Sequence, residues 1–102
     1  MAALLPDETV DAAVAHGLAW ERRDGALVKT WRGRDFAAAL GYVNAVGALA
    51  EAMDHHPDID LRWDTVTLRL WTHTAGGITA LDLELARRID ALDGPDPDPP
   101  RR

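Results

Sequence analysis

Three of the four histidines in this 102-residue chain fall in two short segments that could carry acid–base chemistry. His55 and His56 stand directly before Pro57, and His73 follows after a stretch in which a strand could run away and return. Imidazole titrates near neutral pH, so several imidazoles at one place can both accept and donate protons. We therefore predict that the two segments meet and that their histidines act as general acids and bases.

Each of these residues also has a simpler structural interpretation. The adjacent histidine pair could interact with the last carbonyls of a helix, where the helix dipole favours a cation. His73 could be a polar residue at the end of a strand. Asp82 stands three residues after Thr79, where the carboxylate of a capping box belongs. Glu51 could be a solvated helix residue or a weak i,i+4 partner of His55.

Other kinds of chemistry have less support from the residue types. The chain has no cysteine, and adjacent histidines point in different directions, whereas zinc needs three or four convergent ligands. We therefore expect no metal site. A Ser-His-Asp site is unsupported because the chain has no serine. His16, which precedes Gly17, is explained by the end of a helix.

The composition indicates which binding partners and which cellular location are to be expected for the chain. The net charge is −6, and no run of Lys or Arg forms a basic stripe, which disfavours direct binding to nucleic acid. The first residues lack the features of a secretory signal, and no segment approaches the roughly 20 apolar residues of a bilayer span. We expect a cytoplasmic protein with one domain, residues 1–93, and a disordered Pro/Asp-rich tail, residues 94–102.

Three helices are predicted around these segments. The first spans residues 7–16. Asp35 can cap the second, and Pro57 ends it, because the residue before a proline is pushed out of the α region. The third opens at Thr79. The expected buried faces of the second and third helices are formed by Phe36, Leu40, Val43, Val46 or Gly47, Ala50 and Met53, and by Leu85, Ala86, Ile89 and Leu92.

The strands are predicted from turn signals and alternation. Extended runs at residues 18–23 and 26–32 flank Asp24-Gly25, a dipeptide that suits a tight hairpin. Residues 65–71 alternate between apolar and semi-polar side chains, which places Trp71 and His73 on the face away from the core. Antiparallel strands with helices gathered on one face give an α+β fold, because each apolar helix stripe must be buried against the sheet.

The residues around the histidines together resemble the signature of the pterin-4a-carbinolamine dehydratases. The matching segments are Glu51–Asp58, Thr72-His73, Gly76–Thr79 and Asp82-Leu83, in the same order and with the same spacing. The similarity covers roughly residues 5 to 92. It implies a four-stranded antiparallel sheet with three helices on one face, in the order α-β-β-α-β-β-α, where the last two strands are either separate or one bent strand. It also implies assembly into a homodimer or homotetramer.

The resemblance implies a hydro-lyase reaction as well. The substrate would be 4a-hydroxytetrahydropterin, which loses water to give the quinonoid dihydropterin and so recycles the cofactor of aromatic amino-acid hydroxylases. The pterin is the substrate, and no cofactor is implied. By position, the catalytic residues would be His55, His56 and His73, and the supporting or substrate-binding residues would be Glu51, Pro57, Asp82 and Trp71.

The elimination needs one proton added to the departing hydroxyl and one removed from ring nitrogen N5, which two imidazoles on opposite sides can perform without a metal. We expect His55 and His73 to exchange these protons while His56 binds the hydroxyl or the pterin edge. Many family members have a large aromatic residue where this chain has Ile59, and Trp63 and Trp71 are candidates to replace it.

A different class of function remains open. Relatives with this scaffold include a transcription-factor dimerisation cofactor and factors that assist assembly of Rubisco, so the chain could be a binding module without catalysis. Retention of the three imidazoles together with Asp82 favours the enzyme, because a scaffold has no need of convergent titratable groups.

Overall fold

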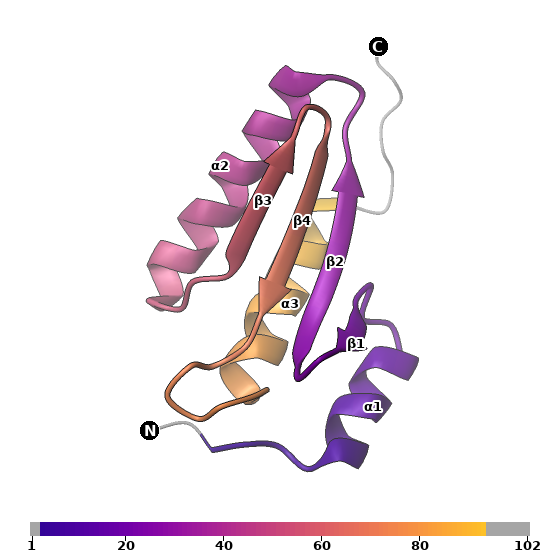
Figure 1. The fold of residues 1–102 in the computed structure, drawn as a ribbon, viewed down its shortest axis with the longest axis vertical. Coiled ribbons are helices and arrows are strands. Elements are labelled where there is room, and N and C mark those ends of the chain that lie inside the picture. The colour runs from indigo at the N-terminus through magenta and orange to yellow at the C-terminus, as the bar shows by residue number, and fades with distance from the viewer. Residues whose placement is uncertain (1–2, 94–102) are drawn as a thin grey trace.

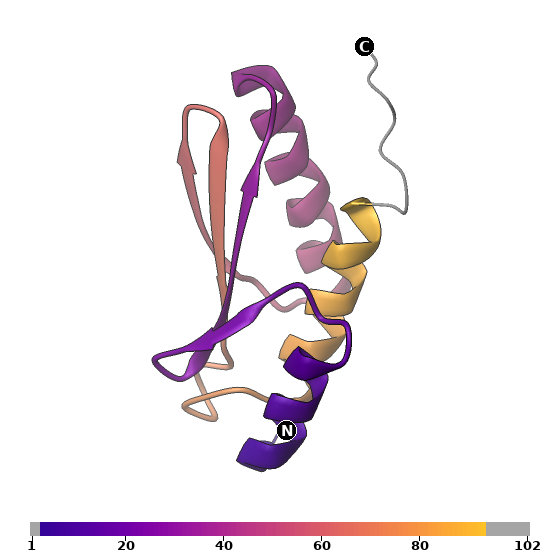
Figure 2. The ribbon, with the colours of Figure 1, turned by 90° about the vertical axis from the view of Figure 1, so that its right-hand side faces the viewer.

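A four-stranded antiparallel sheet carries all three helices on one of its faces (Figures 1 and 2). The computed structural model describes residues 3–93. The predicted α+β fold is confirmed, and its last two strands are separate. The predicted tail, residues 94–102, lies outside the described residues. The elements in chain order are α1 (Asp7–Ala15), β1 (Glu21–Arg23), β2 (Ala26–Arg32), α2 (Phe36–Met53), β3 (Asp58–Arg62), β4 (Thr65–Leu70) and α3 (Ala80–Asp93).

The order of strands across the sheet is β1-β2-β4-β3, with every neighbouring pair antiparallel. β3 starts just after α2 ends, and β4 returns antiparallel to it (Figure 1). This is the return of the chain that we predict between the two histidine segments. The C-terminal end of β4 therefore lies at the same end of the sheet as the C-terminal end of α2. α3 begins at this end too (Figure 1).

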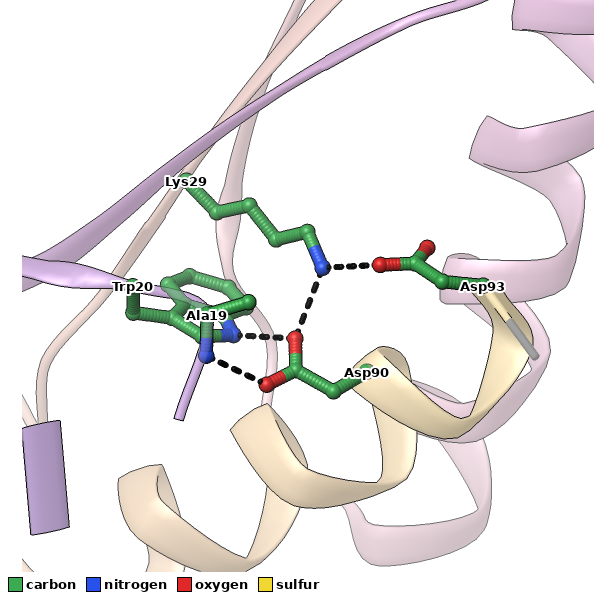
Figure 3. Close-up of polar contacts among 5 residues, drawn as sticks. All are labelled: Ala19, Trp20, Lys29, Asp90 and Asp93. Atoms are coloured by element: carbon green, nitrogen blue, oxygen red, sulfur yellow. Dashed lines mark hydrogen bonds and ion pairs between the residues drawn. The ribbon is translucent and has the colours of Figure 1, made fainter. Parts of the chain in front are cut away.

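The first strand is shorter than predicted. β1 begins at Glu21 and not at residue 18. The preceding segment is held by α3 instead of by the sheet: the backbone N–H of Ala19 and the indole N–H of Trp20 both donate to the carboxylate of Asp90, each at 2.8 Å (Figure 3). A backbone donor engaged in this way is removed from the strand ladder, so the strand starts later.

The core lies between the inner face of the sheet and the two longer helices. Lys29 on β2 also belongs to this inner face, since it stands opposite the buried Leu68. The buried apolar side chains of this layer are Leu27, Val66, Leu68 and Leu70 from the sheet, Ala39, Tyr42, Val46 and Ala50 from α2, and Leu85, Ala86 and Ile89 from α3.

Two predictions about the helix faces are wrong. Phe36 and Leu40 were expected in the core, but they are 47% and 42% exposed. α2 is apolar on every side, so its sequence does not mark the face that meets the sheet. Leu92 was also expected to be buried and is 41% exposed. The last turn of α3 instead turns Asp93, one turn after Ile89, toward Lys29.

The expectation that no segment approaches the length of a bilayer span is wrong for α2. It is the one helix in the described part of the chain that is long and apolar enough to cross a membrane, by length and composition only. Its 18 residues have a mean hydropathy of 1.3. This is weak evidence for a membrane helix, because core helices of globular proteins pass the same test. Here the face that carries Val46 and Ala50 is packed against the sheet.

Lys29 is the centre of a buried polar cluster that links the sheet to α3 (Figure 3). Its side chain is 5% exposed, and its Nζ lies 2.7 Å from Oδ1 of Asp90 and 2.7 Å from Oδ2 of Asp93. Asp90 also accepts the hydrogen bonds from Ala19 and Trp20. A buried ammonium needs paired charges to offset its lost hydration, and this cluster supplies two.

Tyr42 lies in the core, and its hydroxyl has no hydrogen-bond partner among residues 3–93. Its ring stacks on Trp31, with ring centroids 4.1 Å apart and planes 3° from parallel. Burial, and after it the negative charges of Asp93 and Asp90, raises the pKa of Tyr42 above the usual tyrosine value. The folded protein therefore holds this phenolic proton more tightly than the unfolded chain does.

This difference predicts a loss of stability at alkaline pH. The contribution of Tyr42 is complete below about pH 10, where an unfolded tyrosine starts to ionise, and is lost as the pH rises through the folded pKa. We expect the free energy of unfolding, measured in urea, to fall more steeply above about pH 10 in the wild type than in Tyr42→Phe. Tyr42 is the only tyrosine in the chain, so tyrosinate absorbance reports it alone. Ordinary titration of this tyrosine in the folded protein would contradict the prediction.

Candidate active site

The turn that ends α2 sends the two adjacent histidines in different directions. Asp54 adopts a left-handed conformation, with φ 50° and ψ 43°, and its N–H bonds back to carbonyls of the last helical turn. The helix therefore stops at Met53, before Pro57 is reached. His55 and His56 lie beyond this reversal, so they belong to the connection between α2 and β3.

His55 turns inward to the start of α3. Its Nε2 lies 2.6 Å from Oδ1 of Asp82, whose side chain is completely buried, and the imidazole itself is 10% exposed. The other carboxylate oxygen, Oδ2, accepts from the hydroxyl of Thr72 at 2.8 Å and from the backbone N–H of Thr79 at 2.9 Å. Two donors therefore bind one oxygen of this buried carboxylate, and the other oxygen faces the imidazole.

Asp82 also occupies the capping position at the start of α3 that the sequence predicts. The backbone N–H of Thr79 donates to Asp82, and the Oγ1 of Thr79 accepts from the backbone N–H of Leu81 at 3.2 Å. The two bonds start α3 as a variant of the capping box, in which the hydroxyl accepts from Leu81 and not from Asp82. The same carboxylate thus forms the cap of a helix and holds an imidazole.

His56 turns outward and pairs with Glu51 at 2.6 Å. Both side chains are exposed, 53% for the imidazole and 79% for the carboxylate. Glu51 was considered as an i,i+4 partner of His55, but the structure pairs it with His56. The reason is the left-handed Asp54, which breaks the helical spacing before His55 is reached.

His73 stands on a tight loop between β4 and α3. The loop closes on Thr72, whose backbone N–H donates to the carbonyl of Gly77 at 2.8 Å and whose carbonyl accepts from the backbone N–H groups that follow. The exposed imidazole of His73 lies against the indole of Trp71, with centroids 4.0 Å apart and a tilt of 33°. The buried indole N–H of Trp71 has no partner in the described part of the chain.

These side chains surround one hollow of about 360 Å³. The volume falls within the range of small-molecule sites, and imidazoles from two different connections face it. The three predicted histidines and Trp71 meet here, Asp82 lies behind His55, Glu51 reaches only His56, and Pro57 leads into β3. The residues that line the hollow are Asp54, His55, His56, Trp71, Thr72, His73, Thr74 and Leu81.

Sequence reasoning did not single out Thr72, Thr74, Asp54 or Leu81 as site residues. Only Thr72 carried a signal, as a hydroxyl residue directly before His73. Of the two tryptophans considered as substitutes for an aromatic pocket residue, Trp71 lines the hollow. The β3–β4 turn lies at the other end of the sheet (Figure 1). Trp63 is in this turn and is 65% exposed.

Neither a second hollow nor any cluster of metal-binding side chains offers an alternative site for acid–base or metal chemistry in the described residues. A hollow of about 400 Å³ lies beside His16 and Arg87 at α1 and α3, but its carboxylate, Asp90, is occupied by the Lys29 cluster. It therefore has one imidazole and no second free acid–base group. Within residues 3–93, no group of three or more His, Asp or Glu side chains is placed to hold a metal ion.

Comparison with known proteins decides the family. Residues 3–92 match the family model of pterin 4 alpha carbinolamine dehydratase. The chain belongs to this family. A protein of Mycolicibacterium vanbaalenii, provisionally named a pterin-4-alpha-carbinolamine dehydratase, is 50% identical over 92 residues, which cover 90% of this chain and 99% of that protein. A protein of Roseiflexus castenholzii with the same provisional name is 45% identical over 92 residues, with coverage of 90% and 99%.

Solved structures of related dehydratases share the fold. A transcriptional coactivator/pterin dehydratase from Brucella melitensis superposes with a TM-score of 0.82 at 29% identity, covering 88% of this chain and 98% of that one. A pterin dehydratase-like protein described as a RuBisCO assembly factor in the alpha-carboxysome gives a TM-score of 0.61 at 26% identity, with coverage of 79% and 94%. Solved structures with this fold thus include proteins described as a coactivator and as an assembly factor.

Proposed function

We propose that this chain dehydrates a 4a-hydroxytetrahydropterin to the quinonoid dihydropterin. The observation that carries the proposal is the convergence of His55, His56 and His73 on one hollow, with Asp82 buried behind the first of them. A structural module would gain little from exposing three imidazoles to one cavity. Recycling of a hydroxylase cofactor in the cytoplasm is the role that this reaction would serve.

The proposed reaction needs two proton transfers. One imidazole donates a proton to the hydroxyl on C4a, the C–O bond breaks, and water leaves. A second imidazole removes the proton from N5, and the electron pair of the N–H bond forms the N5=C4a double bond. We assign these transfers to His55 and His73, which stand on separate connections, and we assign binding of the hydroxyl or the pterin edge to His56 with Glu51.

The direct test is a stopped-flow measurement of the dehydration of 4a-hydroxytetrahydropterin by the purified protein. We expect the protein to accelerate the loss of water well beyond the spontaneous rate, in proportion to its concentration. A rate equal to the spontaneous one at every protein concentration would rule out the dehydratase and leave the binding module. That alternative is favoured by one specific observation, the coactivator and assembly-factor descriptions of the two structural relatives.

We further propose that the chain forms a homodimer or homotetramer through α2. Between Phe36 and Ala50 the helix has no charged residue, and both Phe36 and Leu40 are exposed in the single chain. An apolar helix face of this kind is removed from water when it packs against a second copy.

This assembly predicts that Leu40→Glu lowers the oligomer mass. Light scattering after gel filtration should give a multiple of 11.1 kDa for the wild type and a smaller multiple for the variant, because a buried unpaired carboxylate opposes association. Leu92→Glu is the matched control, since Leu92 on α3 is as exposed as Leu40 but lies outside α2. A wild-type monomer, or equal effects of both substitutions, would contradict an α2 interface.

A further inference from the structure

Thr72 is tied to both halves of the histidine site. Its hydroxyl is buried and donates to Asp82, the partner of His55. Its backbone closes the loop that carries the next residue, His73: the N–H of Thr72 bonds to Gly77, and its carbonyl accepts from the N–H groups of residues 75, 76 and 77. One residue therefore has contacts that position an imidazole on each side of the hollow.

The hydrogen bonds behind His55 have only one consistent direction. Oγ1 of Thr72 lies 2.8 Å from Oδ2 of Asp82 and 2.8 Å from Oγ1 of Thr79. A hydroxyl donates one proton, and Oδ2 of Asp82 acts as an acceptor, because the backbone N–H of Thr79 also donates to it. Thr72 must therefore donate to Asp82, so Thr79 must donate to Thr72. The Oγ1 of Thr79 in turn accepts from the backbone N–H of Leu81.

This direction fixes the proton on His55. Oδ2 of Asp82 already accepts from Thr72 and from the backbone of Thr79, and imidazole is a stronger base than a carboxylate, so the proton between Oδ1 of Asp82 and Nε2 of His55 belongs to the imidazole. His55 is then protonated at Nε2 in its neutral form and in its charged form. Nδ1 is the ring nitrogen that can gain or lose a proton.

We propose that Thr72 is a positioning residue that, through Asp82, holds His55 as the Nε2–H tautomer, so that its proton exchange with the ligand occurs at Nδ1. The kinetic part of this proposal rests on the dehydratase function proposed above, whereas the tautomer does not depend on it. Through its backbone the same threonine keeps the His73 loop closed, which sets the second imidazole relative to the first.

Thr72→Val tests the proposal because it keeps the branched shape and removes only the hydroxyl. We expect nitrogen NMR of the wild type to show His55 in the Nε2–H form, and we expect Thr72→Val to populate the Nδ1–H form as well. The His55 signals are identified by their loss in His55→Gln. A neutral His55 that carries its single proton on Nδ1 in the wild type would overturn the proposal without any variant being made.

Kinetics provide the second readout. We expect Thr72→Val to lower kcat by about 10- to 100-fold with little change in KM, the size of effect seen when a residue that orients a metal-ligating histidine is replaced. Thr72→Ser keeps the hydroxyl and should restore most of the rate. Thr67→Val is the control, because Thr67 lies on β4 away from the site.

The outcomes separate the two proposals. If the wild type accelerates dehydration and Thr72→Val equals it in both rate and tautomer, the positioning role is wrong and the dehydratase stands. If the wild type shows no dehydration, the dehydratase is wrong, and the tautomer of His55 in the wild type and in Thr72→Val still tests the hydrogen-bond direction. A Ser variant as slow as Val would assign the effect to packing and would also contradict the proposal.

Discussion

Replacing either His55 or His73 by alanine should lower the rate of 4a-hydroxytetrahydropterin dehydration by about 10²–10⁴-fold, the range for loss of a general acid or base. The two imidazoles line the same hollow from different connections, so neither can take over the other's proton transfer without moving. The measurement is single-turnover dehydration by each purified variant. The two effects should also be non-additive in the double variant, because one reaction uses both groups.

The fold should survive both changes. His73 is exposed, and Asp82 keeps its bonds from Thr72 and Thr79 when His55 is removed. Circular dichroism should therefore show wild-type secondary structure. His16→Ala is the control, because this exposed histidine at the end of α1 lies outside the site and should leave the rate unchanged. Dehydration at nearly the wild-type rate by both single variants would defeat the assignment of the two proton transfers.

Lys29→Met should destabilise the protein by about 3 kcal/mol, near the lower end of the range for breaking a buried ion pair. The substitution preserves much of the side-chain volume but leaves the carboxylates of Asp90 and Asp93 facing each other without the ammonium. Both carboxylates keep some contact with water, which is why the lower end applies. The measurement is urea unfolding at neutral pH.

A surface ion pair provides the comparison for Lys29. Arg88 and Glu84 on α3 are paired at 2.9 Å, but both are about half exposed. Arg88→Met should therefore change the free energy of unfolding by less than about 0.5 kcal/mol, as expected for an exposed i,i+4 pair. An equally small loss for Lys29→Met would show that its two ion pairs contribute no more than one at the surface.

The sequence was sufficient for the fold and for most of the site because its signals there are local or combine at fixed spacing. Asp24-Gly25 marks a hairpin whose two residues both have positive φ, 52° and 76°. Thr79 and Asp82 mark a helix start. The convergence of His55 and His73 followed from the need for a short antiparallel return between them.

The features that could not be predicted depend on contacts between elements, which no local sequence pattern encodes. The inner face of α2 could not be predicted because every side of that helix is apolar. From the sequence, Lys29 would be expected to be a solvated strand residue, but in the fold two carboxylates of α3 pair with it. From the sequence, Thr72 would be expected to be an ordinary strand-end residue, but in the fold its hydroxyl donates to Asp82. In each case the decisive partner lies on a different element.

The double role of Asp82 affects how the sequences of other chains with this fold should be interpreted. Because one carboxylate starts α3 as well as holding His55, a related chain without catalytic activity would still need it to start the helix. Its presence in a sequence is therefore poor evidence of activity. The exposed imidazoles of His56 and His73 start no helix, so their loss or retention is the better guide when enzymes are to be distinguished from scaffolds.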